Sequence, residues 1–184
     1  VEAANLIGST QIQGRATMGG NLCNASPAAD SVPALIAAGA KAVVIGPKGR
    51  REVAVEDVVV GPRKLSLTAG ELVAAFLLPA RPKHAGDAYL RFIPRTEMDI
   101  AVVGCGVSLA LDASGVCTSA RVALGAVASE KTKANCWSKA FHADTKDATS
   151  MPISLMCCLT TITSGCRHLF CQHKATSNWL KSTD

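Results

Sequence analysis

Residues 15–30 read RATMGGNLCNASPAAD, and this stretch organises the rest of the chain. The glycine pair Gly19 and Gly20 follows Thr17 and precedes Asn21. Adjacent glycines let backbone amides turn inward and approach an anion with no side chain in the way, which forms a concave nest for phosphate. The stretch therefore indicates a phosphate-binding loop.

Small polar side chains surround this glycine pair. Hydroxyls, amides and one carboxylate of the kind that suit a ribose or ribityl chain are supplied by Thr17, Asn21, Asn24, Ser26 and Asp30. The spacing differs from other phosphate loops, since no lysine follows the glycines as in a P-loop and no third glycine completes the dinucleotide fingerprint. A glycine pair is also common in a tight turn that binds nothing, and the residues alone leave that alternative open.

Composition narrows the class of protein. The chain has 184 residues, of which 48% are hydrophobic and 18% are charged, and this balance is typical of a globular protein with a real core. The net charge is +5 and aromatic residues are only 4%, so we expect no nucleic-acid partner. No apolar run reaches the ~20 residues that a membrane helix needs. Without a signal-peptide pattern, a cytoplasmic protein is expected.

The hydrophobic pattern predicts mostly strands around one clear helix. The helix is expected at residues 31–38, with Asp30 or Ser31 as its N-cap and Gly39 as its stop. A short helix is expected at 1–7 and an extended piece at 11–16. Further extended segments are expected at 40–45, 50–55, 58–60, 65–68, 72–78, from 88 onward, 99–111 and 116–126, with a loop at 82–87. The pairs 40–45 with 50–55 and 99–111 with 116–126 are predicted hairpins.

The motif ATMGGNLCNASPAAD at residues 16–30 resembles the second FAD-binding motif of a known flavoprotein family. The family is the flavoprotein (medium) subunit of molybdenum-containing hydroxylases, with its PCMH-type FAD domain; it includes aerobic carbon monoxide dehydrogenase medium chains and xanthine dehydrogenase FAD domains. The likeness runs from about Glu2 to Ala128. Further motifs in the family's order are GPRK at 61–64, GEL at 70–72, LP at 78–79 and MDIA at 98–101.

The resemblance implies an α+β fold in which a mixed sheet packs with helices and a small α+β domain follows. Residues 1–83 would be the C-terminal portion of the FAD-binding domain, and residues 88–128 the start of the flavoprotein C-terminal domain. Residues 129–184 form an atypical tail. The chain begins after the family's first FAD motif, so it is expected to be a fragment whose start lies upstream.

The same resemblance implies contacts with the phosphate and sugar parts of FAD. Thr17, Gly19 and Gly20 would hold the pyrophosphate, with Asn21 beside them. Asp30 would bond the sugar-alcohol region. From the residues alone, Asp30 could equally be a helix cap.

The ring contacts are implied in the same way. Leu72 or Val73 would form a wall against a ring, and Arg91 would lie near the isoalloxazine, where a positive charge stabilises the anionic reduced flavin. The plain alternatives are that Leu72 and Val73 belong to the core and that Arg91 lies on a solvated face. Ile93 and Pro94 stand where the family usually has a glycine and an arginine.

The implied function is electron transfer by FAD. Electrons would pass from iron–sulfur clusters through FAD to an external acceptor, and the partners would be a molybdopterin-binding large subunit and an iron–sulfur small subunit. No His, Cys or Ser cluster suggests a catalytic nucleophile or base in this chain. Two rival functions remain: a non-catalytic remnant or assembly module, and a flavin reductase of the enolpyruvoyl-glucosamine reductase type.

The tail departs from the family. After Ala128 the family continues into charged, alanine-rich helices, whereas this chain has clustered Thr, Ser and Cys, which suggests a disrupted reading frame or a divergent terminus. A zinc site is conceivable there, but its spacing fits no common zinc finger, and no metal is expected. Its candidate ligands are Cys157, Cys158, Cys166, His168, Cys171 and His173.

Overall fold

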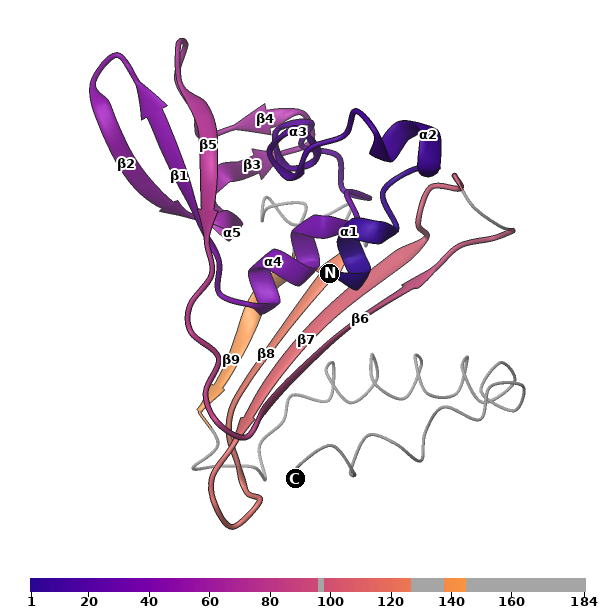
Figure 1. Ribbon diagram of the computed structural model, residues 1–184, viewed down its shortest axis with the longest axis vertical. Coiled ribbons are helices and arrows are strands. Elements are labelled where there is room, and N and C mark those ends of the chain that lie inside the picture. Colours follow the sequence, from indigo (N-terminus) through magenta and orange to yellow (C-terminus); the bar gives the residue numbers. More distant parts are fainter. Residues whose placement is uncertain (96–97, 127–137, 145–184) are drawn as a thin grey trace. The chain divides into compact units, whose positions relative to one another are not determined.

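The computed structural model describes residues 1–95, 98–126 and 138–144. Helices pack with antiparallel sheets, which confirms the expected α+β class (Figure 1). The strands in this part of the chain form a three-stranded, a two-stranded and a four-stranded sheet. The predicted domain limits and the tail interpretation stay predictions. The zinc candidates, and all of the tail except residues 138–144, lie outside the described residues.

The N-terminal segment is more helical than the sequence suggested. Helix α1 covers Glu2–Asn5, α2 covers Thr10–Gln13 and α3 covers Met18–Cys23. The extended piece expected at 11–16 is therefore wrong, and the glycine pair lies in a helix rather than a loop. The glycine pair is helical because Thr17 is the N-cap of α3. Its Oγ1 accepts a hydrogen bond from the Gly20 amide at 2.9 Å.

Helix α4, Ser31–Ala37, is the predicted central helix. It ends where expected, since Gly39 has a φ of +68°, in the left-handed region that favours glycine. Six of its seven residues are buried, and four of them join one apolar core with residues of α3 and of the three-stranded and four-stranded sheets. A helix this short is marginal by itself, so packing stabilises it.

The first sheet is built on the predicted hairpin. Strand β1, Lys41–Gly46, pairs with β2, Gly49–Ala54, on one side and with β5, Leu72–Leu77, on the other. The segment between them differs from the prediction: Val55–Val58 forms the short helix α5, followed by the small strands β3, Val59–Gly61, and β4, Lys64–Leu65.

The second sheet contains the other predicted hairpin, β7, Val103–Leu111, and β8, Cys117–Gly125. Strand β6, Ala85–Phe92, starts inside the expected 82–87 loop, because Ala85 already pairs with Ala110. Strand β9, Ser138–Asp144, falls in the atypical tail and was not predicted.

Helix α4 lies directly on the second sheet, and a glycine allows that approach. A Cβ at Gly106 of β7 would lie 2.5 Å from the Pro33 carbonyl oxygen and 2.8 Å from its carbonyl carbon. Contacts this short cannot be relieved by rotating a side chain, because the neighbour is backbone. Gly106 therefore sets the distance between the helix and the sheet.

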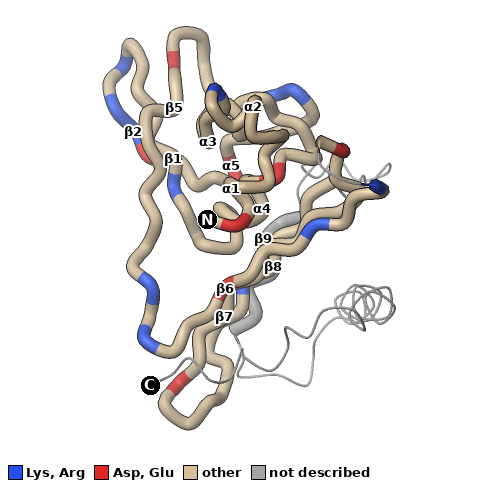
Figure 2. The backbone as a smooth tube through the Cα atoms, turned by 45° about the vertical axis from the view of Figure 1, so that its right-hand side comes forward, with Lys and Arg blue, Asp and Glu red and all other residues tan. Residues whose placement is uncertain are grey.

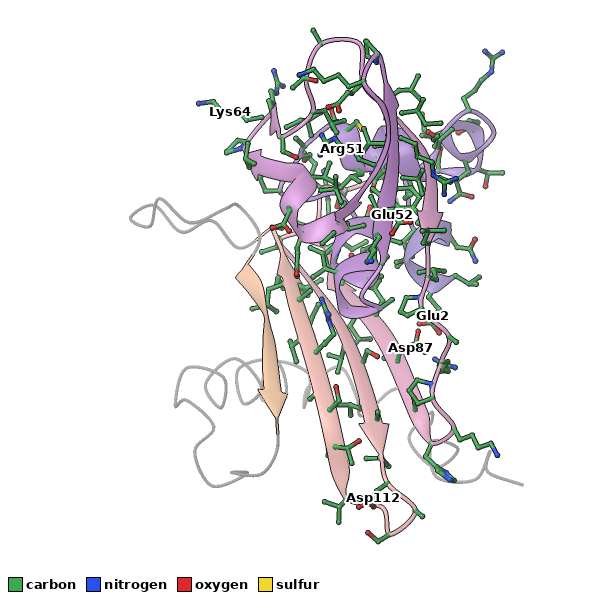
Figure 3. All side chains as sticks on the ribbon, turned by 90° about the vertical axis from the view of Figure 1, so that its left-hand side faces the viewer. Glu2, Arg51, Glu52, Lys64, Asp87 and Asp112 are labelled. Atoms are coloured by element: carbon green, nitrogen blue, oxygen red, sulfur yellow. The ribbon has the colours of Figure 1, made fainter. Side chains whose placement is uncertain are left out.

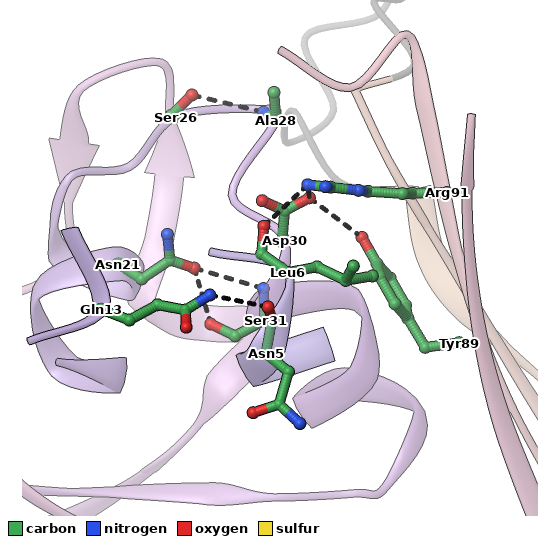
Figure 4. A network of polar contacts seen from close by, with 10 residues as sticks. All are labelled: Asn5, Leu6, Gln13, Asn21, Ser26, Ala28, Asp30, Ser31, Tyr89 and Arg91. Carbon is green, nitrogen blue, oxygen red and sulfur yellow. Dashed lines mark hydrogen bonds and ion pairs between the residues drawn. The ribbon is translucent and has the colours of Figure 1, made fainter. Parts of the chain in front are cut away.

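A largely buried polar cluster joins α4 and the second sheet (Figure 4). Arg91 of β6 forms an ion pair with Asp30 at 3.1 Å and donates a hydrogen bond to the Leu6 carbonyl oxygen at 2.8 Å. The Arg91 and Asp30 side chains are only 9% and 13% exposed. Burial raises the pKa of Asp30, while the hydrogen bond and charge of Arg91 act in the opposite direction.

We expect Gly106→Ala to lower the free energy of unfolding by about 2–3 kcal/mol, because the added methyl group forces α4 away from the sheet. Gly14→Ala is the matched control. Gly14 has a φ of −62°, and its Cβ would lie 3.8 Å from the nearest atom. Urea denaturation measures both variants. Equal stabilities for the two alanine variants would contradict the role of Gly106.

Arg91→Met should lower the free energy of unfolding by about 3 kcal/mol at neutral pH, since it leaves the largely buried Asp30 carboxylate without its charged partner. In the variant, burial keeps the folded-state pKa of Asp30 above its unfolded value, so protonation favours the folded state. The deficit should therefore shrink as the pH falls through that raised pKa. The control is Arg95→Met, because the Arg95 side chain is 81% exposed and the loss there should stay below about 1 kcal/mol.

Candidate functional site

A pocket of about 600 Å³ lies beside the start of α3. This volume is within the range of small-molecule sites. Its walls come from three segments: the first turns of α3, the stretch that follows β4, and the turn that leads into β5. The lining residues are Thr17, Gly19, Gly20, Cys23, Leu65, Leu67, Thr68, Ala69, Gly70, Glu71, Leu72 and Val73.

The α3 side of the pocket offers backbone donors. Met18 and Gly19 begin the helix, so their amides have no partner within α3. The Gly20 amide is already bonded to Thr17 Oγ1. Gly19 lies against β5, where an added Cβ would be 3.7 Å from the Val73 carbonyl oxygen. The first turn of α3 is thus in van der Waals reach of β5.

The opposite wall is apolar. Leu65, Leu67 and Val73 are partly buried and pack against the core, whereas Leu72 is 57% exposed. An exposed leucine next to free amides suits a ligand that has a flat ring attached to an anionic group. The sequence prediction named Leu72 and Val73 but missed Leu65 and Leu67, whose short segment carried no motif.

The turn before β5 contains the strongest charged contact at the pocket. Glu71 accepts hydrogen bonds from Arg51 Nε at 2.8 Å and Arg51 Nη2 at 2.9 Å, and from the Thr68 amide at 2.7 Å. The two hydrogen bonds from Arg51, followed by that of Thr68, hold the pKa of Glu71 at about 2. Glu71 is therefore a carboxylate at any ordinary pH.

Asn21 serves a different purpose in the structure. Its Oδ1 accepts hydrogen bonds from Ser31 Oγ at 2.6 Å and from the Ser31 amide at 3.3 Å, which ties α3 to α4 (Figure 4). The asparagine does not line the pocket. It holds α3, whose first residues line the pocket, against α4.

Asp30 and Arg91 also lie outside the pocket lining. Asp30 occupies the N-cap position of α4 without a side-chain cap hydrogen bond, because its carboxylate faces Arg91 and the Tyr89 hydroxyl. Burial, together with the negative charge of Asp30, raises the pKa of Tyr89, so the phenol stays protonated. Of the predicted site residues, the pocket lining contains Thr17, Gly19, Gly20, Leu72 and Val73. The other three, Asn21, Asp30 and Arg91, lie outside that lining.

The described residues contain no group of three or more His, Cys, Asp or Glu side chains placed to hold a metal ion. None of their helices has both the length and the apolar character needed to cross a membrane.

Family models match both parts of the chain. Residues 1–81 match the FAD binding domain in molybdopterin dehydrogenase, and residues 88–144 match the CO dehydrogenase flavoprotein C-terminal domain. The first match confirms the expectation of an FAD protein at the level of the family.

Individual relatives agree with these models. The xanthine dehydrogenase FAD-binding subunit of Escherichia coli O157:H7 is 38% identical over 127 residues, which cover 68% of this chain and 43% of that protein. The nicotinate dehydrogenase FAD-subunit of Eubacterium barkeri is 31% identical over 129 residues, or 68% of this chain and 44% of that protein. The chain thus spans less than half the length of these relatives.

A solved structure gives the same answer for the fold. Carbon monoxide dehydrogenase from Hydrogenophaga pseudoflava matches with a TM-score of 0.66 and 30% identity, covering 82% of this chain and 49% of that one. The resemblance read from residues 16–30 is confirmed by sequence and by structure. The chain therefore belongs to the family of FAD-binding subunits of molybdenum-containing hydroxylases.

Proposed function

We propose that this chain is part of an FAD-binding subunit that transfers electrons within a molybdenum hydroxylase. One observation supports this above the others: the first turn of α3, with the Gly19 amide, and an exposed apolar wall line one pocket, inside the segment that matches the FAD-binding family. FAD, when bound, accepts electrons and passes them to an external acceptor. The protein's part is to bind and orient it.

Different residues of the pocket contact different parts of FAD. The Gly19 amide binds the pyrophosphate, and Thr17 holds the first turn of α3 in the conformation that presents this amide. Leu72 and Val73 pack against a ring. The direct FAD contacts predicted for Asn21, Asp30 and Arg91 stay predictions, since these side chains bond to Ser31, to one another and to Leu6.

The partners and the location are part of the same proposal. The named relatives are FAD subunits of xanthine and nicotinate dehydrogenases, and we expect a molybdopterin-binding large subunit and an iron–sulfur small subunit as partners here. The cytoplasmic location stays a prediction. The relatives do not favour the rival function of a flavin reductase. The other rival, an assembly module without bound FAD, is tested by measuring whether the chain binds flavin.

The first test is flavin absorbance. The purified chain, and a chain extended upstream to the length of its relatives, are each mixed with FAD and freed of unbound ligand. We expect bound flavin in the extended chain at least, because the matched residues cover only 43% and 44% of these relatives. If both chains stay colourless, the FAD proposal fails and the assembly module is favoured.

Thr17→Val should then weaken FAD binding by about tenfold, because the N-cap acceptor of the Gly20 amide is lost and the first turn of α3 frays. Equilibrium dialysis measures the dissociation constant. Thr118→Val is the control, since the Thr118 hydroxyl donates to the Ala110 carbonyl oxygen on the second sheet and does not line the pocket. An unchanged dissociation constant in Thr17→Val would remove Thr17 from the site.

A further inference from the structure

Arg51 does not line the pocket, yet it is bonded to a residue that does. It lies on β2, next to Glu52, on the outer strand of the first sheet (Figure 3). Glu71 lies on the far side of the middle strand, β1, in the turn before β5. The ion pair must therefore cross β1.

Gly46 makes that crossing possible. A Cβ at this position of β1 would lie 2.6 Å from Glu71 Cγ and 3.4 Å from Glu71 Cα. Any side chain there would occupy the space that the Glu71 side chain now fills. Since Val44 is paired with both Arg51 and Val73, the crossing lies on the face of the sheet that carries the pocket residue Val73.

The pair also sets the conformation of the pocket turn. Glu71 accepts from the Thr68 amide at 2.7 Å, while its own amide donates to the Thr68 carbonyl oxygen at 3.0 Å. Gly70, between them, has a φ of +84° and lies against Pro47 of the β1–β2 turn. The first hairpin thus supports the turn from outside, through Arg51 and Pro47.

Charge gives the pair a second effect. Glu71 lines the same pocket as Thr17, Gly19 and Gly20, so its negative charge lies in the wall of the site proposed for a pyrophosphate. An uncompensated carboxylate there would repel the ligand. The bidentate guanidinium of Arg51 cancels that charge while leaving the carboxylate able to hold the Thr68 amide. Basic and acidic positions are both present along the backbone of β2 (Figure 2).

We infer that Arg51 is a positioning residue of the FAD site: acting through Glu71 and across Gly46, it fixes the 68–71 turn and neutralises a carboxylate that would repel the cofactor. This inference rests on the proposed function. It concerns residues on β1 and β2 that contribute no atom to the pocket.

The test compares Arg51→Met with Lys41→Met, which removes the cation of the Lys41–Glu52 pair in the same hairpin. That control pair is well exposed, at 59% and 42%, and does not reach the pocket. Arg51→Met should accelerate hydrogen exchange at the Thr68 amide by about tenfold and weaken FAD binding by about tenfold or more. Lys41→Met should change neither.

Further variants separate charge from shape. Arg51→Met combined with Glu71→Gln should keep the fast exchange but recover part of the FAD affinity, because the repelling carboxylate is gone. Compared with Arg51→Met, Arg51→Lys should restore more of the FAD affinity than of the slow hydrogen exchange at the Thr68 amide. Lysine keeps the positive charge but lacks the bidentate geometry. Arg51→Met should weaken the binding of ADP about as much as that of FAD. Riboflavin, which lacks phosphate, should lose less affinity.

Each result decides something. If wild type binds FAD and Arg51→Met matches Lys41→Met in exchange and affinity, the inference is overturned and the proposed function stands. If riboflavin loses as much affinity as ADP, the charge effect is overturned. If neither the wild-type chain nor the extended chain binds FAD or ADP, the proposed function fails, and the role of Arg51 in the site fails with it.

Discussion

Close packing of α4 on the second sheet is the constraint on which the rest of the structure depends. The helix is too short to be stable alone, yet it contributes Val32, Leu35 and Ile36 to a core that also receives side chains from α3, β1 and β8. Each such side chain stabilises the fold by about 1.5–3 kcal/mol when fully buried. That burial requires the backbone of α4 to reach the sheet, which the missing side chain of Gly106 permits.

Local signals made part of this architecture predictable. The helix at 31–38 could be predicted because Gly39 ends it and apolar residues fill it. The first hairpin could be predicted because Gly46, Pro47 and Gly49 mark its turn, and Gly49 has a φ of +104°. The cofactor family could be predicted because residues 16–30 combine many specific positions in one stretch.

Other features depend on contacts between distant residues, and no local pattern reveals those. The glycine pair has poor helix propensity, so the sequence predicts a loop, but Thr17 caps α3 and Asn21 ties it to Ser31. Strand β6 begins early because its partner lies on β7, about 25 residues later in the chain. The role of Arg51 was missed for the same reason, since its partner Glu71 is 20 residues away.

These contacts link the pocket to both sheets. On one side, the first turn of α3 is held by Asn21 to Ser31, and the neighbouring Asp30 is held by Arg91 to β6. On the other side, the 68–71 turn is held by Glu71 to Arg51 on β2. Both walls of the pocket are therefore short segments that lack stability of their own and take their geometry from polar contacts behind them. In such a site, residues outside the pocket hold the ligand-contacting residues in position. This matters because an amide binds an anion most tightly when its direction is fixed before the anion arrives.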